Sequence, residues 1–315
     1  MIALLAPGQG AQSPGMLAPW LVLDGAAERI AAWSEATGLD LRRLGTTADA
    51  EEIKDTAVTQ PLVVALSLLA AEELVRRIDL PTDAPVAGHS VGELAAAAVA
   101  GVLTADEAVA LAAVRGREMA AACALEQTGM SAVLGGDPDD VTAVLAQLGL
   151  DAANCNGAGQ IVAAGRLDAL AALTQHKPAH ARVRSLPVAG AFHTRFMAPA
   201  EDALAEYATQ LTAKDPARPL LSNADGKVVE EGAEMLRRLV VQVTKPVRWD
   251  SCMATLRALG VTATVEFPPA GTLSGLVKRD LKGTVTLALK APEDLDKVAG
   301  LICDHSAADH SGTQA

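Results

Sequence analysis

The stretch that decides the fold is residues 84–100, which read APVAGHSVGELAAAAVA. An apolar run precedes the pentapeptide Gly88-His89-Ser90-Val91-Gly92 and an alanine-rich run follows it, a pattern that predicts a strand, a sharp turn and a helix. Gly88 and Gly92 lack the side chains that would clash on such a turn. We therefore expect Ser90 at the end of a sheet, beside the N–H groups of a helix N-terminus, where an acyl group can be transferred through a serine ester.

The composition narrows the class of protein. Half of the 315 residues are apolar and 20% are charged, as in a globular protein with a large core. The net charge is −12 and no lysine- or arginine-rich block occurs, so we expect no nucleic-acid partner. No run of about 18 apolar residues is free of charges, so we expect no membrane span. The four cysteines lack metal-ligand spacing, which predicts reduced thiols, a cytoplasmic protein and no metal site.

The chain divides into two patterns. Strands and helices alternate over the first 120 residues, which predicts a parallel sheet covered by helices on both faces. From Gly129 a tighter βαββαβ order begins, which predicts a small ferredoxin-like unit. We therefore expect a large α/β part over 1–128 and 190–303, an inserted subdomain over 129–189, and a disordered tail over 304–315.

A serine hydroxyl is a weak nucleophile until a base accepts its proton. Among the six histidines, His193 is the best candidate, because it follows a small-residue connection where the insertion returns to the main sheet. The alternative is a buried histidine of the core. His89 is expected to form a wall of the site, since neighbours on a turn point in different directions. Gln9, in the loop after the first strand, could donate to an oxyanion through its side chain or its backbone.

Arg115 interrupts an otherwise apolar helical stretch. One interpretation is a side chain that reaches into solvent. The other is a buried guanidinium, which binds a carboxylate through two parallel hydrogen bonds. If that carboxylate does not come from the protein, it belongs to the substrate.

With these residues in hand, the chain resembles the malonyl-CoA:acyl carrier protein transacylases over residues 1–300. Each shared motif is weak alone, but their joint occurrence in this order is specific. The alanine-rich composition and residues 188–195 are most similar to enzymes of Streptomyces and related actinobacteria. The chain departs from the usual Gly-Pro-Gly of the family at 267–271, where it reads FPPAG. The motifs are GQGAQ at 8–12, GHSVGE at 88–93, Arg115-Gly116 with Met119, NCNGAGQ at 154–160 with Val162, AFHT at 191–194 with Met197, Gln242 with PVRW at 246–249, and GTLSGL at 271–276.

The resemblance implies a catalytic role for five residues. Ser90 carries the acyl group and His193 is its base. The backbone carbonyl of Gln242 orients the imidazole, in place of the more usual carboxylate. The backbone N–H groups of Gln9 and Val91 form the oxyanion hole.

The resemblance also implies the substrate contacts. Arg115 binds the free carboxylate of the malonyl group, and Phe192 crowds an α-methyl branch, unless Phe192 is an ordinary core residue. Met119, Asn156 and His89 are the remaining expected substrate-binding residues. The fold implied is an α/β-hydrolase-like core carrying the inserted subdomain.

The implied partners are malonyl-CoA as substrate, with no cofactor, and acyl carrier protein. The carrier is expected to be acidic and this chain is itself acidic, so docking requires a local basic surface. We expect a monomer that serves fatty acid synthesis, and polyketide synthesis stays open as a second pathway. The basic candidates are Arg182, Arg184, Arg195, Lys278 and Arg279.

Two other functions compete with acyl transfer. A serine hydrolase of the α/β-hydrolase type places its histidine after an acid, near the end of the chain, where this sequence has only the histidines of the tail. The position of His193 therefore favours the transferase. A non-catalytic binding module is disfavoured because Ser90 and His193 are both present.

Overall fold

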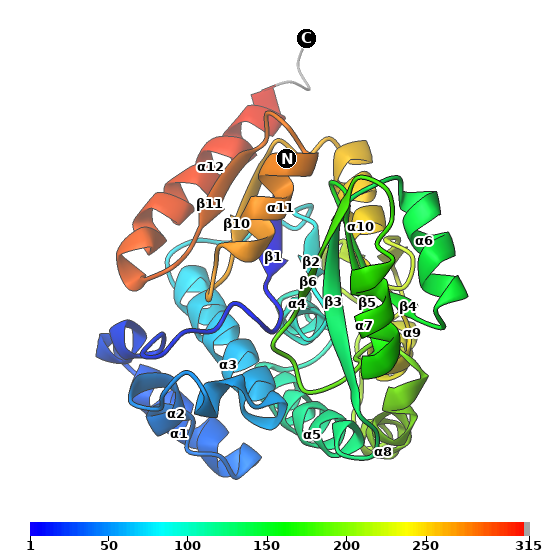
Figure 1. Cartoon of the computed structure of the whole chain (residues 1–315). Coiled ribbons are helices and arrows are strands. Elements are labelled where there is room, and N and C mark those ends of the chain that lie inside the picture. Colours follow the sequence, from blue (N-terminus) through cyan, green and yellow to red (C-terminus); the bar gives the residue numbers. More distant parts are fainter. Residues whose placement is uncertain (312–315) are drawn as a thin grey trace.

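The computed structural model describes residues 1–311, which form two β-sheets and the helices packed around them (Figure 1). The larger sheet has the strand order β11-β10-β1-β2-β7-β8, and its pairs are parallel except for antiparallel β7 and β8. The chain is thus a mixed α/β protein, as the alternation of strands and helices predicts. The strands of this sheet are β1 (Ile2–Ala6), β2 (Val86–Gly88), β7 (Leu220–Leu221), β8 (Val228–Val229), β10 (Ala263–Glu266) and β11 (Val285–Ala288).

Strand β1 lies inside the larger sheet and is buried along its whole length. Ile2, Leu4 and Ala6 belong to the core on one face, whereas Ala3 and Leu5 belong to the core on the other. Because helices cover both faces, the strand is a continuous apolar run rather than an alternating one. The helices of this part are α1 (Ala26–Thr37), α2 (Leu41–Thr46), α3 (Thr56–Val75), α4 (Gly92–Val99), α5 (Ala105–Cys123), α8 (Ala198–Ala208), α9 (Gly232–Val241), α10 (Trp249–Ala258), α11 (Thr272–Asp280) and α12 (Leu295–Ser311), with short 3₁₀ helices at Ala18–Val22, Glu52–Lys54, Arg195–Met197, Gln242–Thr244 and Pro292–Asp294.

Helix α3 is the central helix of the larger part and packs along α5. By length and composition it could cross a membrane, but 83% of its apolar window is buried inside the protein. Its residues are apolar on nearly every side because neighbouring helices and the sheet surround it.

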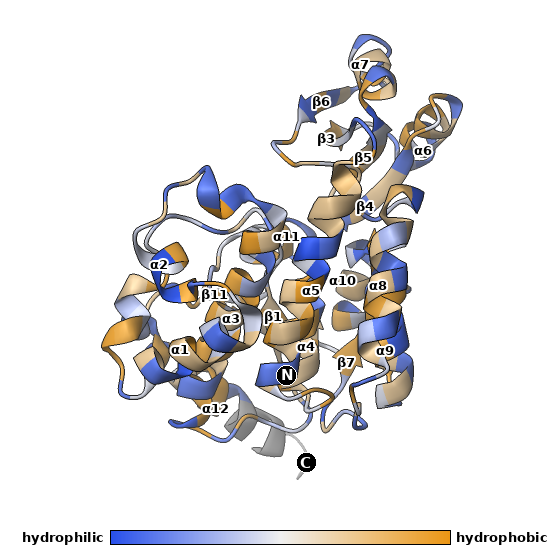
Figure 2. Ribbon diagram, turned by 90° about the horizontal axis from the view of Figure 1, so that it is seen from below, coloured by the Kyte–Doolittle hydropathy of each residue, from blue (hydrophilic) through white to orange (hydrophobic). Residues whose placement is uncertain are grey.

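The second sheet has the strand order β6-β3-β5-β4-β9. Between residues 128 and 185 the elements follow the order βαββαβ, and helices α6 and α7 pack on this sheet over a small core of their own. Figure 2 shows this part standing apart from the larger one. The sequence prediction lacked β9, which pairs parallel to β4 from far along the chain. The elements are β3 (Thr128–Gly135), α6 (Pro138–Gln147), β4 (Asp151–Gly157), β5 (Gln160–Arg166), α7 (Leu167–Gln175), β6 (Ala181–Ser185) and β9 (Val247–Arg248).

The prediction of a disordered tail from residue 304 was wrong for residues 304–311, which continue helix α12. Leu295, Val298 and Ile302 bury the first turns of α12 against the core. The next residues include alanines, which are good helix formers, so the helix continues once it has been started. Residues 312–315 of the predicted tail lie outside the described residues.

Candidate active site

A cavity of about 460 Å³ lies where the carboxyl ends of β1 and β2 face the second sheet. The register pairs Ala6 with Gly88, so the loop after β1 and the turn after β2 leave the larger sheet side by side. Gln9 and Ser90 therefore line the same wall, although 81 positions separate them. Helix α11 closes another side of the cavity through residues 271–279.

The turn that carries Ser90 is as strained as the sequence predicts. Ser90 has a φ of 54°, in the left-handed region that side chains other than glycine rarely adopt. A Cβ at Gly88 would lie 2.1 Å from the backbone of Gly92, and a Cβ at Gly92 would lie 2.3 Å from the carbonyl oxygen of Ala6. The backbone N–H of Ser90 donates to Oδ1 of Asn223 at 2.8 Å, which helps to hold this conformation.

His193 lies next to Ser90, with 2.7 Å between its Nε2 and the serine Oγ. Its Nδ1 lies 2.9 Å from the backbone oxygen of Gln242. A carbonyl oxygen can only accept, so Nδ1 carries the proton and Nε2 presents a lone pair to the hydroxyl of Ser90. The structure thus brings together three residues that are 103 and 49 positions apart along the chain.

His193 is buried, and its surroundings keep it neutral. Burial, and secondly the positive charge of Arg115, lower the pKa of His193 to about 3. The imidazole is therefore unprotonated over the neutral pH range and is available as a base.

Gln9 and Val91 line the cavity, and the backbone N–H groups of both are without a protein acceptor in the described chain. Val91 precedes helix α4, and in residues 1–311 neither its N–H nor that of Gln9 donates to a protein atom. The side chain of Gln9 points elsewhere, since its amide donates to Oγ1 of Thr56 at 3.3 Å. The backbone N–H of Gln9 is thus free for an oxyanion, whereas its side-chain amide already has a partner in Thr56.

Arg115 is a buried side chain, with 2% of its surface exposed. Its guanidinium donates to Oε1 of Gln60 at 2.7 Å, to Oε1 of Gln242 at 2.8 Å and to Oγ of Ser90 at 3.3 Å. Burial lowers its pKa to about 10, although the charge of Glu93 opposes this shift, so Arg115 is cationic at neutral pH. Within the described part of the chain it forms no ion pair, although it lines the cavity. The alternative of a solvent-exposed arginine is therefore excluded.

Comparison with known proteins places this geometry in a family. The acyl transferase domain family matches residues 4–310. The malonyl CoA-acyl carrier protein transacylase of Mycobacterium tuberculosis H37Rv is 64% identical over 302 residues, which cover 96% of this chain and 100% of that protein. The chain belongs to the malonyl CoA-acyl carrier protein transacylase family.

Other members of this family are similar over nearly the same length. The transacylase of Escherichia coli K12 is 33% identical and covers 92% of this chain, with 96% of that protein aligned. The crystal structure of the Mycobacterium tuberculosis protein matches with a TM-score of 0.92 at 63% identity, over 95% of this chain and 99% of that one. These mycobacterial relatives agree with the actinobacterial resemblance seen in the sequence.

The second sheet contributes polar and apolar walls to the transacylase cavity. Oδ1 of Asn156 lies 2.8 Å from Nε2 of His89, and Nδ2 of Asn156 donates to Oε1 of Gln160 at 3.3 Å. That second bond fixes the amide so that its oxygen faces His89, which must then donate from Nε2. Desolvation lowers the pKa of His89, and its ring meets the edge of Trp249 at 5.6 Å. His89 lines the cavity, as the sequence predicts for a wall residue, and its lowered pKa keeps it neutral.

The remaining expected substrate contacts, Met119 and Phe192, are both buried and both line the cavity. Of the basic candidates for carrier docking, only Arg279 lines the cavity. Arg182 and Arg184 are exposed on strand β6, and Lys278 and Arg279 are exposed on α11, where Arg279 reaches the cavity. Arg195 is exposed too, and its guanidinium lies over the ring of Phe196 at 4.7 Å.

Sequence reasoning missed three residues of this site. Gln60 holds Arg115, Asn223 holds the backbone of Ser90, and Glu93 accepts from both Asn223 and Gln242. A polar residue in the apolar stretch of α3 could have pointed to Gln60. Nothing local distinguishes Asn223, because asparagine is common in turns.

Proposed function

We propose that this protein transfers a malonyl group from malonyl-CoA to the pantetheine thiol of acyl carrier protein, through a malonyl ester on Ser90, in fatty acid synthesis. One observation carries the proposal: a buried, cationic Arg115 without a carboxylate partner in the described chain lies 3.3 Å from Oγ of Ser90. A substrate that brings its own carboxylate satisfies that charge. Polyketide synthesis is a second pathway open to the same product, and no cofactor takes part.

In the first half-reaction, His193 accepts the proton of Ser90 through Nε2 as Oγ attacks the thioester carbonyl. The N–H groups of Gln9 and Val91 bind the oxyanion that forms, and each such donor stabilises the transition state by roughly 3 kcal/mol. The tetrahedral intermediate then expels the thiolate of coenzyme A, which takes the proton from His193. The carbonyl of Gln242 holds the imidazolium in place during these steps.

In the second half-reaction, the thiol of the carrier protein attacks the ester on Ser90. His193 again accepts the proton, this time from the thiol, and returns it to Oγ as the serine leaves. The same oxyanion hole serves both halves, so the kinetics are of the ping-pong type.

Arg115 explains why malonyl is preferred to acetyl. An acetyl group would leave the guanidinium buried and unpaired, and a buried charge that loses its partner costs about 3–5 kcal/mol. Phe192, next to His193, adds a second selection, since it lines the cavity and its ring crowds an α-methyl branch of the acyl group.

We also propose the wider setting. Residues 1–128 and 190–303 form an α/β-hydrolase-like domain, and residues 129–189 form a ferredoxin-like subdomain, which the strand order β6-β3-β5-β4 supports. The enzyme is a cytoplasmic monomer. The acidic carrier docks across the cavity mouth, between the arginines of β6 and the basic end of α11.

Mass spectrometry after brief mixing with malonyl-CoA tests the proposal. We expect a malonyl adduct on Ser90, which acyl carrier protein then removes as malonyl-carrier product. The variant Ser90→Ala should form no adduct and lose transfer by about four orders of magnitude. Release of free malonate without carrier product would favour the serine hydrolase, and unchanged transfer by Ser90→Ala would remove the serine from the mechanism.

A further inference from the structure

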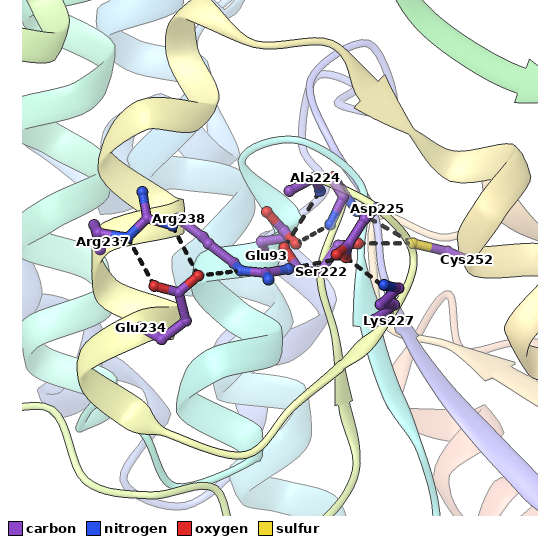
Figure 3. A network of polar contacts seen from close by, with 10 residues as sticks. Glu93, Ser222, Ala224, Asp225, Lys227, Glu234, Arg237, Arg238 and Cys252 are labelled. Carbon is purple, nitrogen blue, oxygen red and sulfur yellow. Dashed lines mark hydrogen bonds and ion pairs between the residues drawn. The ribbon is translucent and has the colours of Figure 1, made fainter.

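Glu93 lies three residues after the nucleophile, inside helix α4, and is buried with 1% of its surface exposed. Both of its carboxylate oxygens accept hydrogen bonds. Oε1 accepts the backbone N–H of Asn223 at 2.6 Å, and Oε2 accepts Nε2 of Gln242. In Figure 3 Glu93 faces the turn that runs from Ser222 to Asp225. The mechanism above makes no use of this carboxylate.

The side-chain amide of Gln242 connects Glu93 to the substrate-binding arginine. Its Nε2 donates to Glu93 and to the backbone oxygen of Ser90 at 3.2 Å, while its Oε1 accepts from Arg115 at 2.8 Å. When it is ionised, the carboxylate of Glu93 can only accept, so it requires the NH₂ group of the amide on its side. If the amide were flipped, its NH₂ group would face the guanidinium, where two donors would oppose each other.

We propose that Glu93 is a positioning residue for the acyl group: by fixing the amide of Gln242, it holds Arg115 in the place where it binds the malonyl carboxylate. This inference rests on the proposed function. The inference gives Gln242 two separate roles: its backbone carbonyl orients His193, and its side-chain amide orients Arg115.

The segments that donate hydrogen bonds to Glu93 are themselves fixed by other contacts. The turn at 222–227 is fixed to helix α9, because Nη1 of Arg238 donates to Oδ1 of Asp225 at 2.9 Å (Figure 3). Helix α9 leads directly into Gln242. Both partners of Glu93 therefore come from segments that are already tied together, and their N–H groups converge on one carboxylate.

The charge on Glu93 depends on these same partners. Burial raises its pKa to about 8, against the hydrogen bonds from Asn223 and Gln242 and the positive charges of Arg115 and Arg238, so Glu93 is mostly ionised only above that pH. A neutral amide cannot replace the carboxylate, because one of its two ends is an NH₂ group that would meet an N–H donor. In the variant Glu93→Gln the side chain keeps its shape, and its amide oxygen can still accept the backbone N–H of Asn223, so its NH₂ group faces Gln242 and disturbs that amide.

The test is made at a pH above the pKa of Glu93, and it compares single-turnover loading of Ser90 from malonyl-CoA with loading from acetyl-CoA, which has no free carboxylate. For Glu93→Gln we expect malonyl loading to slow about 30-fold and acetyl loading to slow less than about threefold. In an Arg115→Met background, Glu93→Gln should cause no further loss of malonyl loading, because the two residues act through one path. The matched control is Glu73→Gln, which alters a buried glutamate of α3 paired with Arg76 and Arg77.

An equal loss of both loading reactions in Glu93→Gln would overturn the inference, because it would show a general structural role. Additive losses of malonyl loading in the Glu93→Gln, Arg115→Met double variant would also overturn it. If Glu93→Gln does not fold, Glu93→Asp replaces it, since this variant keeps a carboxylate but shortens its reach to Gln242, and the same selective loss is expected. Failure of the wild-type protein to form a malonyl ester would instead refute the proposed function.

Discussion

The two sheets contribute side chains of different charge to the wall of one cavity. The charged and titratable side chains on its wall come from the larger part: His89, Arg115, His193 and Arg279. The residues from the second sheet and its edge are all uncharged: Met130, Ala132, Asn154, Asn156, Gln160, Val162, Leu186 and Val188. The larger part therefore supplies the chemistry, and the second sheet supplies shape and neutral hydrogen bonds.

This division has a physical reason. A buried charge is tolerated only where fixed hydrogen bonds satisfy it, and the parallel sheet with helices on both faces provides such a rigid frame. One face of the second sheet has its own small core, whereas Met130, Val162 and Ala164 on the sheet join the core of the larger part. Changes on the face with its own core should therefore disturb that frame least. Changes in the larger part should therefore affect folding and turnover, and changes in the second sheet should affect substrate affinity.

The largest effect is expected from a pair of glycines. In Gly88→Ala the new Cβ meets backbone at 2.1 Å, so the turn cannot keep its conformation. We expect a loss of about 3 kcal/mol or more in unfolding free energy and no loading of Ser90. In Gly129→Ala, on β3, the nearest atom is the flexible end of Leu167 at 3.1 Å, and we expect a change within about 1 kcal/mol. Denaturant unfolding measures both, and equal stabilities would break the comparison.

A pair of asparagines gives the next effect. Asn223→Ala leaves the N–H of Ser90 and the carbonyl of Gly88 without their side-chain partner. We expect kcat to fall about 100-fold, because the nucleophile is displaced. Asn156→Ala removes the partner of His89 on the second sheet, and we expect KM for malonyl-CoA to rise about tenfold with kcat within about twofold. Steady-state kinetics separate the two, and a shared loss of kcat would contradict the division between the sheets.

The smallest effect is expected from the charge of Arg115 on its neighbour His193. Charged side chains on the cavity wall come only from the larger part. Burial and then the charge of Arg115 hold the pKa of His193 at about 3, below its ordinary 6.5. The native state therefore binds fewer protons there than the unfolded state, and this stability is lost as the pH falls from 6.5 towards 3. In Arg115→Met the pKa of His193 should rise, although burial remains. Labelling of Ser90 by a neutral sulfonyl fluoride should then lose rate at a higher pH than in the wild type, and an unchanged pH profile would contradict the coupling.

Local chemistry accounts for what could be predicted. The glycines around Ser90, the apolar run of β1 and the βαββαβ order are patterns of neighbouring residues, and the structure has the turn, the strand and that order of elements. The tail prediction failed because helix α12 is started by buried residues upstream of it. Strand β9 escaped prediction because two residues carry no detectable pattern and form a strand only by pairing with β4.

For the site, the sequence by itself determined where a strained serine must lie, because only glycine fits beside such a turn. It also supplied an arginine within an apolar stretch and one well-placed histidine as candidates. The tertiary structure decided that these meet, that a backbone carbonyl selects the tautomer of His193, and that Glu93 fixes the amide between the base and the arginine. The reason is range: steric limits act between neighbours in the chain, whereas hydrogen bonds across 49 or 149 positions exist only after the sheet has brought their loops together.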